Sequence, residues 1–102
     1  MILITGVIEL ESEQEFDRVR HFLAARAERS RKDKGNIEYT FSQDVNDPKK
    51  IVLTEKWESE AMLNEHLKIP DEEFSSVLAN AKIRTANICS YDATNERTLM
   101  SR

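Results

Sequence analysis

This chain of 102 residues has few of the residues from which many functional sites are built, with one cysteine, two histidines, two glycines and two prolines. The single cysteine, Cys89, excludes an internal disulfide and predicts a reducing, cytoplasmic environment. Two glycines cannot form a glycine-rich phosphate loop, and the histidines and the cysteine lie on separate predicted elements. We therefore expect no nucleotide, no metal ion and no other cofactor.

Long apolar runs and a strong excess of one charge are also absent. No apolar stretch approaches the roughly 20 residues of a membrane span, and MILITGVIEL alternates like a strand rather than like a leader segment. The composition, 39% apolar and 33% charged, is typical of one globular domain. The net charge of −4 argues against a nucleic-acid surface. We expect neither a membrane nor a nucleic acid as a partner.

The first third of the chain predicts a strand followed by a helix. Residues 1–10 form the strand, in which Gly6 indicates a bulge or a close approach by another group. Ser12 and Glu15 have the spacing of a capping box, and Gly35 is predicted to end the helix. Four apolar residues follow the helical period on one stripe: Phe16, Val19, Leu23 and Ala27.

The basic segment RAERSRKDKG, residues 26–35, lies at the predicted end of this helix. It could bind an anion, but cations at a helix end commonly stay in solvent and complement the negative end of the helix dipole. We therefore interpret the segment as a solvated helix end. His21 falls opposite the apolar stripe, so we predict that it is exposed and has no function.

The middle of the chain predicts a hairpin. Its strands are residues 36–44 and 51–57, joined by the turn-forming segment 45–50. The first strand places three large side chains on one face: Ile37, Tyr39 and Phe41. The second strand places four residues on one face: Ile51, Leu53, Glu55 and Trp57.

The last third predicts a helix, a second helix and a strand. Ser59 is the predicted cap of a short helix that runs to about Leu67, and Pro70 begins the next helix. Residues 82–92 form the last strand. The resulting order, β-α-β-β-α-β with the second helix broken at Pro70, predicts an α+β, ferredoxin-like fold with a four-stranded antiparallel sheet.

This plan places the helices on one face of the sheet and leaves the other face bare. Because the strands carry apolar residues on both faces, we expect a homodimer that packs sheet against sheet. The domain comprises residues 1–92, and the tail, residues 93–102, is expected to be disordered or to pair with the other subunit.

The short second helix raises the main functional question. Its apolar arc contains Met62, Leu63, Leu67 and Ile69, and His66 lies near the centre of that arc. An inward imidazole tends to be neutral and can act as a general base or a hydrogen-bond partner. The alternative is a structural core histidine bonded to a backbone carbonyl or to Glu55.

Other residues near His66 also allow two interpretations. Trp57, at the end of its strand, could be plain packing or a pocket wall. Glu55 is more consistent with an ion pair to a Lys or Arg than with a catalyst. Tyr39 and Tyr91 could line a cavity or only place their hydroxyls at its rim.

The run from Gly35 to Leu67 resembles the antibiotic biosynthesis monooxygenase family, which includes quinol monooxygenases. The residues that carry the resemblance are a glycine and a tyrosine, an Asp-Pro hairpin, the E-x-W-E-S strand end and a helix with A-x-x-x-H-L: Gly35, Tyr39, Asp47, Pro48, Glu55, Trp57, Glu58, Ser59, Ala61, His66 and Leu67. The similarity is firm over residues 35–70, and the element order extends it to about residue 92.

The resemblance implies a dimeric α+β barrel with one pocket per subunit. Family members oxygenate polycyclic phenols or quinols with O2 and neither metal nor flavin, because the deprotonated substrate itself reduces O2. It further implies that His66 is the base or orienting group and that Trp57 and Tyr39 form pocket walls; Glu55, Met62 and Leu53 complete the expected pocket.

The chain departs from the family pattern at several positions. Asp71 stands where many members have a second histidine, and Leu53 where the aromatic-polyketide oxygenases have an asparagine. Gly6 lies near the place of an asparagine in haem-degrading relatives, and residues 71–81 contain no haem-ligating histidine. The expected function is a cofactor-independent monooxygenase of a small aromatic or quinol-type substrate. The alternatives are a non-catalytic small-molecule-binding or assembly module, or a His-based isomerase or decarboxylase of a small carbonyl metabolite.

Overall fold

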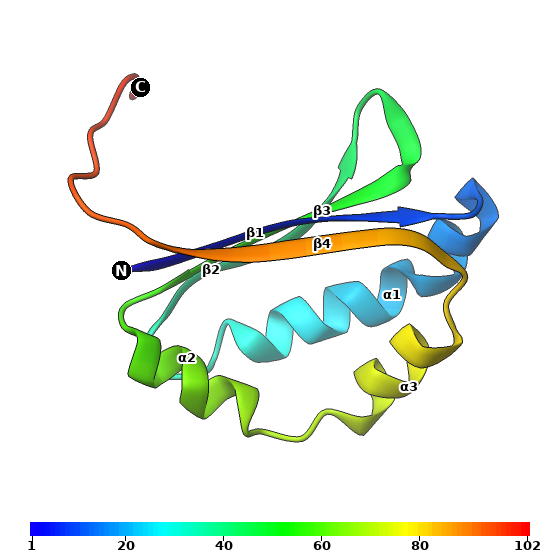
Figure 1. Ribbon diagram of the computed structural model, residues 1–102, viewed down its shortest axis with the longest axis horizontal. Helices are drawn as coiled ribbons and strands as arrows, with labels where there is room; N and C mark the ends of the chain where they lie inside the picture. The colour runs from blue at the N-terminus through cyan, green and yellow to red at the C-terminus, as the bar shows by residue number, and fades with distance from the viewer.

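The computed structural model describes all residues 1–102 and has the predicted ferredoxin-like α+β architecture. Four antiparallel strands lie in the order β2-β3-β1-β4, and Figure 1 shows all three helices on one side of the sheet. The elements follow in chain order: β1 (Ile2–Leu10), α1 (Glu13–Ser30), β2 (Asn36–Asp44), β3 (Asp47–Trp57), α2 (Glu60–Leu67), α3 (Glu72–Asn80) and β4 (Ile83–Asp92).

Helix α1 begins as predicted but ends earlier. The Ser12 side chain accepts a hydrogen bond from the Glu15 amide at 3.2 Å. The Glu15 carboxylate does not complete the capping box, because it accepts hydrogen bonds from Arg18 and from the Lys82 amide instead. The helix ends at Ser30, five residues before Gly35. Gly35 has a φ of +85° and lies against Met62, so the glycine serves the turn into β2 rather than the helix end.

The hairpin of β2 and β3 is present, with one local correction. The register shifts between Asn36 and Glu38, so Ile37 is an extra residue on the β2 strand. Such a bulge turns a side chain off its expected face, and Ile37 is 53% exposed whereas Tyr39 is buried. Strand β3 also begins earlier than predicted, at Asp47.

Gly6 marks a close approach, one of the two possibilities that its position predicted. A Cβ atom at Gly6 would lie 2.6 Å from Cγ1 of Ile88 on the neighbouring strand β4. The irregularity of the β1–β4 pairing lies elsewhere, between Glu9 and Leu10. The glycine therefore lets β4 and its isoleucine pack directly beside β1.

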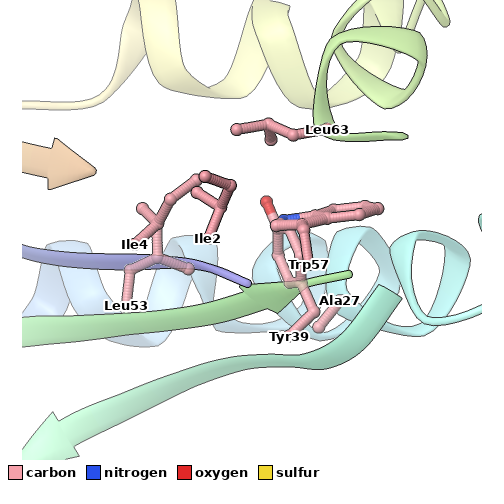
Figure 2. Packing of buried hydrophobic residues seen from close by; sticks show 7 residues of the cluster. All are labelled: Ile2, Ile4, Ala27, Tyr39, Leu53, Trp57 and Leu63. Atoms are coloured by element: carbon pink, nitrogen blue, oxygen red, sulfur yellow. The ribbon is translucent and has the colours of Figure 1, made fainter. Parts of the chain in front are cut away.

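The core consists of two clusters on the helix-covered face. The first joins both central strands to α1, β2 and α2, and Figure 2 shows its members: Ile2, Ile4, Ala27, Tyr39, Leu53, Trp57 and Leu63. The second lies toward the other end of α1: Ile8, Leu10, Val19, Leu23 and Ile51. Phe41 packs against both clusters, so the region around it is where they meet.

The opposite face of the sheet carries no helix (Figure 1). Cross-strand pairing places Val7 beside Val52 and Leu3 beside Tyr91 on this face. Beyond β4, residues 93–102 contain no helix or strand; Ala93 donates a backbone hydrogen bond to Met1. None of the helices combines the length and the apolar composition needed to cross a bilayer.

Candidate functional site

A cavity of about 280 Å³ lies where the two core clusters meet. Its walls come from the sheet, from α1, from α2 and from α3. Ten of its thirteen lining residues are apolar or aromatic, and the other three are Arg26, Glu55 and His66. An apolar hollow with a few converging polar groups is the usual form of a small-molecule site. The apolar and aromatic residues are Ile4, Ile8, Tyr39, Phe41, Leu53, Leu63, Leu67, Phe74, Leu78 and Ile88.

His66 is held on the cavity wall by both ring nitrogens. Its Nδ1 lies 2.5 Å from Oδ2 of Asp33, and its Nε2 lies 3.1 Å from Nη2 of Arg26. The residue is 3% exposed, and its ring centroid lies 4.6 Å from that of Trp57. The inward direction predicted from the helical period is therefore present, and the partners of His66 are side chains rather than a backbone carbonyl or Glu55.

The two partners determine which nitrogen of His66 carries the proton. A guanidinium group can only donate hydrogen bonds, so Nε2 must accept from Arg26. The proton of the neutral ring then lies on Nδ1, which donates to the Asp33 carboxylate. Asp33 thus orients the imidazole and can stabilise the imidazolium, while the lone pair on Nε2 is available once Arg26 leaves it.

Arg26 belongs to a charged cluster that borders the cavity. Nη1 of Arg26 donates to Oδ2 of Asp71 at 3.2 Å, and Arg29 donates to the same oxygen. Asp71 also caps α3, since its Oδ1 accepts from the Phe74 amide at 3.1 Å. Burial alone would raise the pKa of Asp71, but the hydrogen bonds from Arg29, Phe74 and Arg26 outweigh it and lower that pKa. The aspartate at the place of the family's second histidine therefore anchors an arginine.

Glu55 lies in the opposite electrostatic situation. Its Oε1 accepts a hydrogen bond from Nε1 of Trp57 at 2.9 Å. Burial raises the pKa of the Glu55 carboxyl, and the Trp57 hydrogen bond and nearby positive charge oppose that effect only in part. Burial likewise raises the pKa of the Tyr39 phenol, the charge of Glu55 adds to the effect, and Arg26 opposes it. Arg26 thus acts on both groups, and its charge opposes the effect of burial on each pKa.

The comparison with known families decides the membership of the chain. A family model described as antibiotic biosynthesis monooxygenase matches residues 1–73, a span that includes the cavity wall from β1 to His66. The chain belongs to the antibiotic biosynthesis monooxygenase family. Among curated proteins, none matches it.

Solved structures of low sequence identity share the antibiotic biosynthesis monooxygenase fold. A candidate antibiotic biosynthesis monooxygenase from Deinococcus radiodurans is 22% identical, covers 99% of this chain and 100% of its own, and superposes with a TM-score of 0.89. A similar candidate from Nitrosomonas europaea is 14% identical, covers 93% of this chain and 100% of its own, and has a TM-score of 0.81. A third structure, described as an antibiotic biosynthesis monooxygenase, is 22% identical, with 93% and 100% coverage and a TM-score of 0.76.

The cavity contains some of the predicted pocket residues and not others. Tyr39, Leu53, Glu55 and His66 line it. Trp57 does not, because its fully buried indole lies behind Glu55 and His66 and packs in the core. Met62 also lies outside the lining, since its side chain is directed at Gly35. Tyr91 is 53% exposed and borders other hollows of the surface.

The interpretation of residues 26–35 as a solvated helix end is wrong for two of its members. Arg26 lines the cavity, with 13% of its side chain exposed, and Asp33 holds His66. The sequence contains a signal for Arg26, which continues a repeat of alternating three- and four-residue steps, the period of a buried helix face. The members of that repeat are Phe16, Val19, Leu23, Arg26 and Ser30. Lys32 and Lys34 are exposed, as expected for a solvated segment.

His21 is exposed on α1, as its position opposite the apolar stripe predicted. No group of three His, Cys, Asp or Glu side chains is arranged to hold a metal ion.

Proposed function

We propose that this protein is a cofactor-independent monooxygenase, which oxidises a small aromatic or quinol-type substrate with O2 in the cavity beside His66. The observation that carries the proposal is the oriented imidazole, with Asp33 on Nδ1 and Nε2 directed at the cavity-lining Arg26. This is the arrangement of a general base supported by a carboxylate. Family membership supports the choice of oxygen chemistry.

The proposed reaction requires a proton acceptor and an enclosed apolar site. His66 Nε2 accepts a proton from the substrate, which breaks the substrate's O–H or C–H bond and leaves its electron pair on the aromatic system. That electron-rich anion reduces O2; one oxygen atom enters the substrate, and the other leaves as water with two substrate hydrogens. All four electrons come from the substrate. The protein contributes the base, the positioning and the exclusion of water.

The assay is oxygen consumption with a panel of quinols and anthrones. We expect uptake above buffer autoxidation for at least one substrate, and a loss of about 10²–10⁴-fold in rate for His66→Ala, the usual contribution of a general base. His21→Ala removes the other, exposed histidine and is the matched control, which should retain the wild-type rate. No uptake with any panel member contradicts the oxygenase proposal, and equal uptake by His66→Ala removes His66 from the chemistry.

A non-catalytic binding module is the second candidate, because Arg26 already occupies the lone pair of His66. In that case the cavity should bind an aromatic ligand that the protein never oxidises. Calorimetric titration with the same quinols under nitrogen distinguishes the two functions, since binding without any oxygen uptake supports the module.

We also propose that the protein acts as a homodimer in the cytoplasm. The helix-free face of the sheet, with Val7, Val52, Leu3 and Tyr91, supports pairing with a second copy. The lone Cys89 is free and exposed, which suits a reducing compartment.

A further inference from the structure

The guanidinium of Arg26 is incompletely partnered for a buried cation. Its Nη1 donates to Asp71 and its Nη2 to His66, but its Nε is buried and has no hydrogen-bond partner. A buried donor without an acceptor is costly. Arg26 also lines the cavity, and its guanidinium carbon lies 5.0 Å from the ring centroid of Phe74, another lining residue. The side chain of Arg26 therefore borders the cavity while one of its donors still lacks an acceptor.

Arg26 and His66 together offer one donor group and one acceptor. Arg26 can only donate, and the lone pair on Nε2 of His66 can only accept. A hydroxyl is complementary to both, because its oxygen accepts and its hydrogen donates. A carboxylate would satisfy Arg26 but would face the lone pair of Nε2, and an ether oxygen would leave that lone pair without a donor.

The charge of Arg26 favours an oxygen that becomes anionic, because this guanidinium borders the cavity. The Glu55 carboxyl on the same lining acts in the opposite direction, so the effect on a bound oxygen depends on its contact with Arg26. The apolar lining lowers the local dielectric and strengthens the attraction to an anion. Asp33, on the far side of the imidazole, would stabilise the proton that His66 receives.

We propose that Arg26 is the recognition residue of this site, which selects an aromatic ligand with an acidic hydroxyl and binds it as the phenolate. The ligand's oxygen takes the hydrogen bonds of Arg26, and its proton passes to Nε2 of His66, which Arg26 then no longer occupies. Asp71 keeps the guanidinium in place during the exchange. This inference rests on the proposed function for its substrate, but it concerns binding and requires no oxygen chemistry.

The test uses 4-nitrophenol, whose visible absorbance reports its own ionisation, under nitrogen with the full-length protein. Burial in the cavity raises the pKa of a phenol, as it does for Tyr39, and the charge of Arg26 opposes that rise. The apparent pKa of the bound probe should therefore be about one unit lower in the wild type than in Arg26→Gln, a tenfold difference in the preference for the phenolate. Arg29→Gln, which also loses a bond to Asp71 but lies outside the cavity, should keep the wild-type value. The neutral analogue 4-nitroanisole should bind wild type and Arg26→Gln equally.

Two more variants keep the test decisive if Arg26→Gln folds poorly, as judged by circular dichroism and thermal unfolding. Arg26→Lys keeps the charge without the planar donor fork and should retain only part of the shift. Asp71→Asn keeps a good helix cap but releases Arg26, and should also reduce the shift. An unchanged probe pKa in folded Arg26→Gln or Arg26→Lys, relative to wild type, overturns the proposal.

The outcome is separable from that of the oxygenase assay. An Arg26-dependent shift without oxygen uptake leaves the recognition role standing and removes the oxygenase proposal. Oxygen uptake that is unchanged in Arg26→Gln, together with an unshifted probe, removes the recognition role and leaves the oxygenase proposal standing.

Discussion

At the scale of single residues, the site combines two carboxyls whose environments act in opposite directions. Burial raises the pKa of Glu55 from its usual 4.5, while arginines and a backbone amide lower that of Asp71. The sequence showed Glu55 as a carboxylate in an apolar row and suggested an ion pair. Its hydrogen-bond partner is instead the indole of Trp57, which cannot compensate a full negative charge.

Glu55→Gln should therefore change how stability depends on pH. Because the pKa is raised on folding, the folded state binds more protons above pH 4.5, and the wild type loses stability as pH rises through the raised value. Glutamine does not ionise, so the stability of the variant relative to the wild type should increase as pH rises from 4.5 to neutral. Below pH 4.5 the two should differ by a constant amount.

Urea unfolding at several pH values between about 4 and about 8 measures this difference. Glu65→Gln is the control, since the Glu65 side chain is 73% exposed in α2. The difference in unfolding free energy between this variant and the wild type should change little with pH. A wild-type advantage over Glu55→Gln that grows with pH contradicts the assigned burial effect.

At the scale of elements, α1 is joined to the start of β4 through one buried side chain. Glu15 accepts from the Lys82 amide and from Arg18, and a backbone bond from Glu11 to the Lys82 carbonyl lies beside it. Helix α3 has no buried residue of its own. The position of α3 and of the segment after it therefore depends on hydrogen bonds such as those between α1 and Lys82. Helix α3 in turn supplies Phe74 and Leu78 to the cavity.

Glu15→Gln should weaken this junction by about 1–3 kcal/mol at neutral pH, because a buried charged hydrogen-bond acceptor is lost. The hydrogen bonds from Arg18 and the Lys82 amide lower the pKa of Glu15 from 4.5 to about 2. Its contribution is therefore complete above pH 4.5 and disappears as pH falls through about 2. Denaturant unfolding at several pH values checks both statements.

Glu13→Gln, an exposed change in the same helical turn, is the matched control for the junction. It should be close to neutral at every pH. Equal stability losses for the two variants would mean that charge near the helix start, and not the tie to Lys82, is the cause.

At the scale of the whole molecule, the helices cover one face of the sheet and the other face stays open (Figure 1). That open face is less apolar than the sequence suggested. Its central valines and Leu3 are accompanied by threonines, since Thr5 pairs with Thr54 and Thr54 with Thr40. Charged residues lie toward the ends of this face, where Lys56 pairs with Leu3 and Lys50 with Glu9. The β-branched centre is therefore the part that suits sheet-to-sheet packing of two folded subunits.

The expected dimer can be measured by light scattering after gel filtration. We expect twice the chain mass of 11.8 kDa for the wild type. Val7→Arg places a charge at the centre of the open face and should shift the protein toward the monomer. Val45→Arg, in the turn between β2 and β3 and 96% exposed, should leave the mass unchanged. A monomeric wild type at micromolar concentration would contradict the proposal.

The sequence by itself determined the order of elements, the paired strands and the inward side of His66. These features follow from short-range patterns: the two-residue period of strands, the helical period, and the caps Ser12 and Ser59. The sequence did not predict the bulge at Ile37 or the early end of α1, because strand register and helix termini depend on contacts with other elements.

Only the tertiary structure decided what surrounds His66. Its partners Arg26 and Asp33 lie 40 and 33 residues away in the chain, and Asp71 reaches Arg26 across 45 residues. Local periodicity gives the face of a helix on which a residue lies. The packing of α1 against the sheet, α2 and α3 determines which charged side chains are buried together. For this reason Arg26, at one end of a basic segment, lines the cavity.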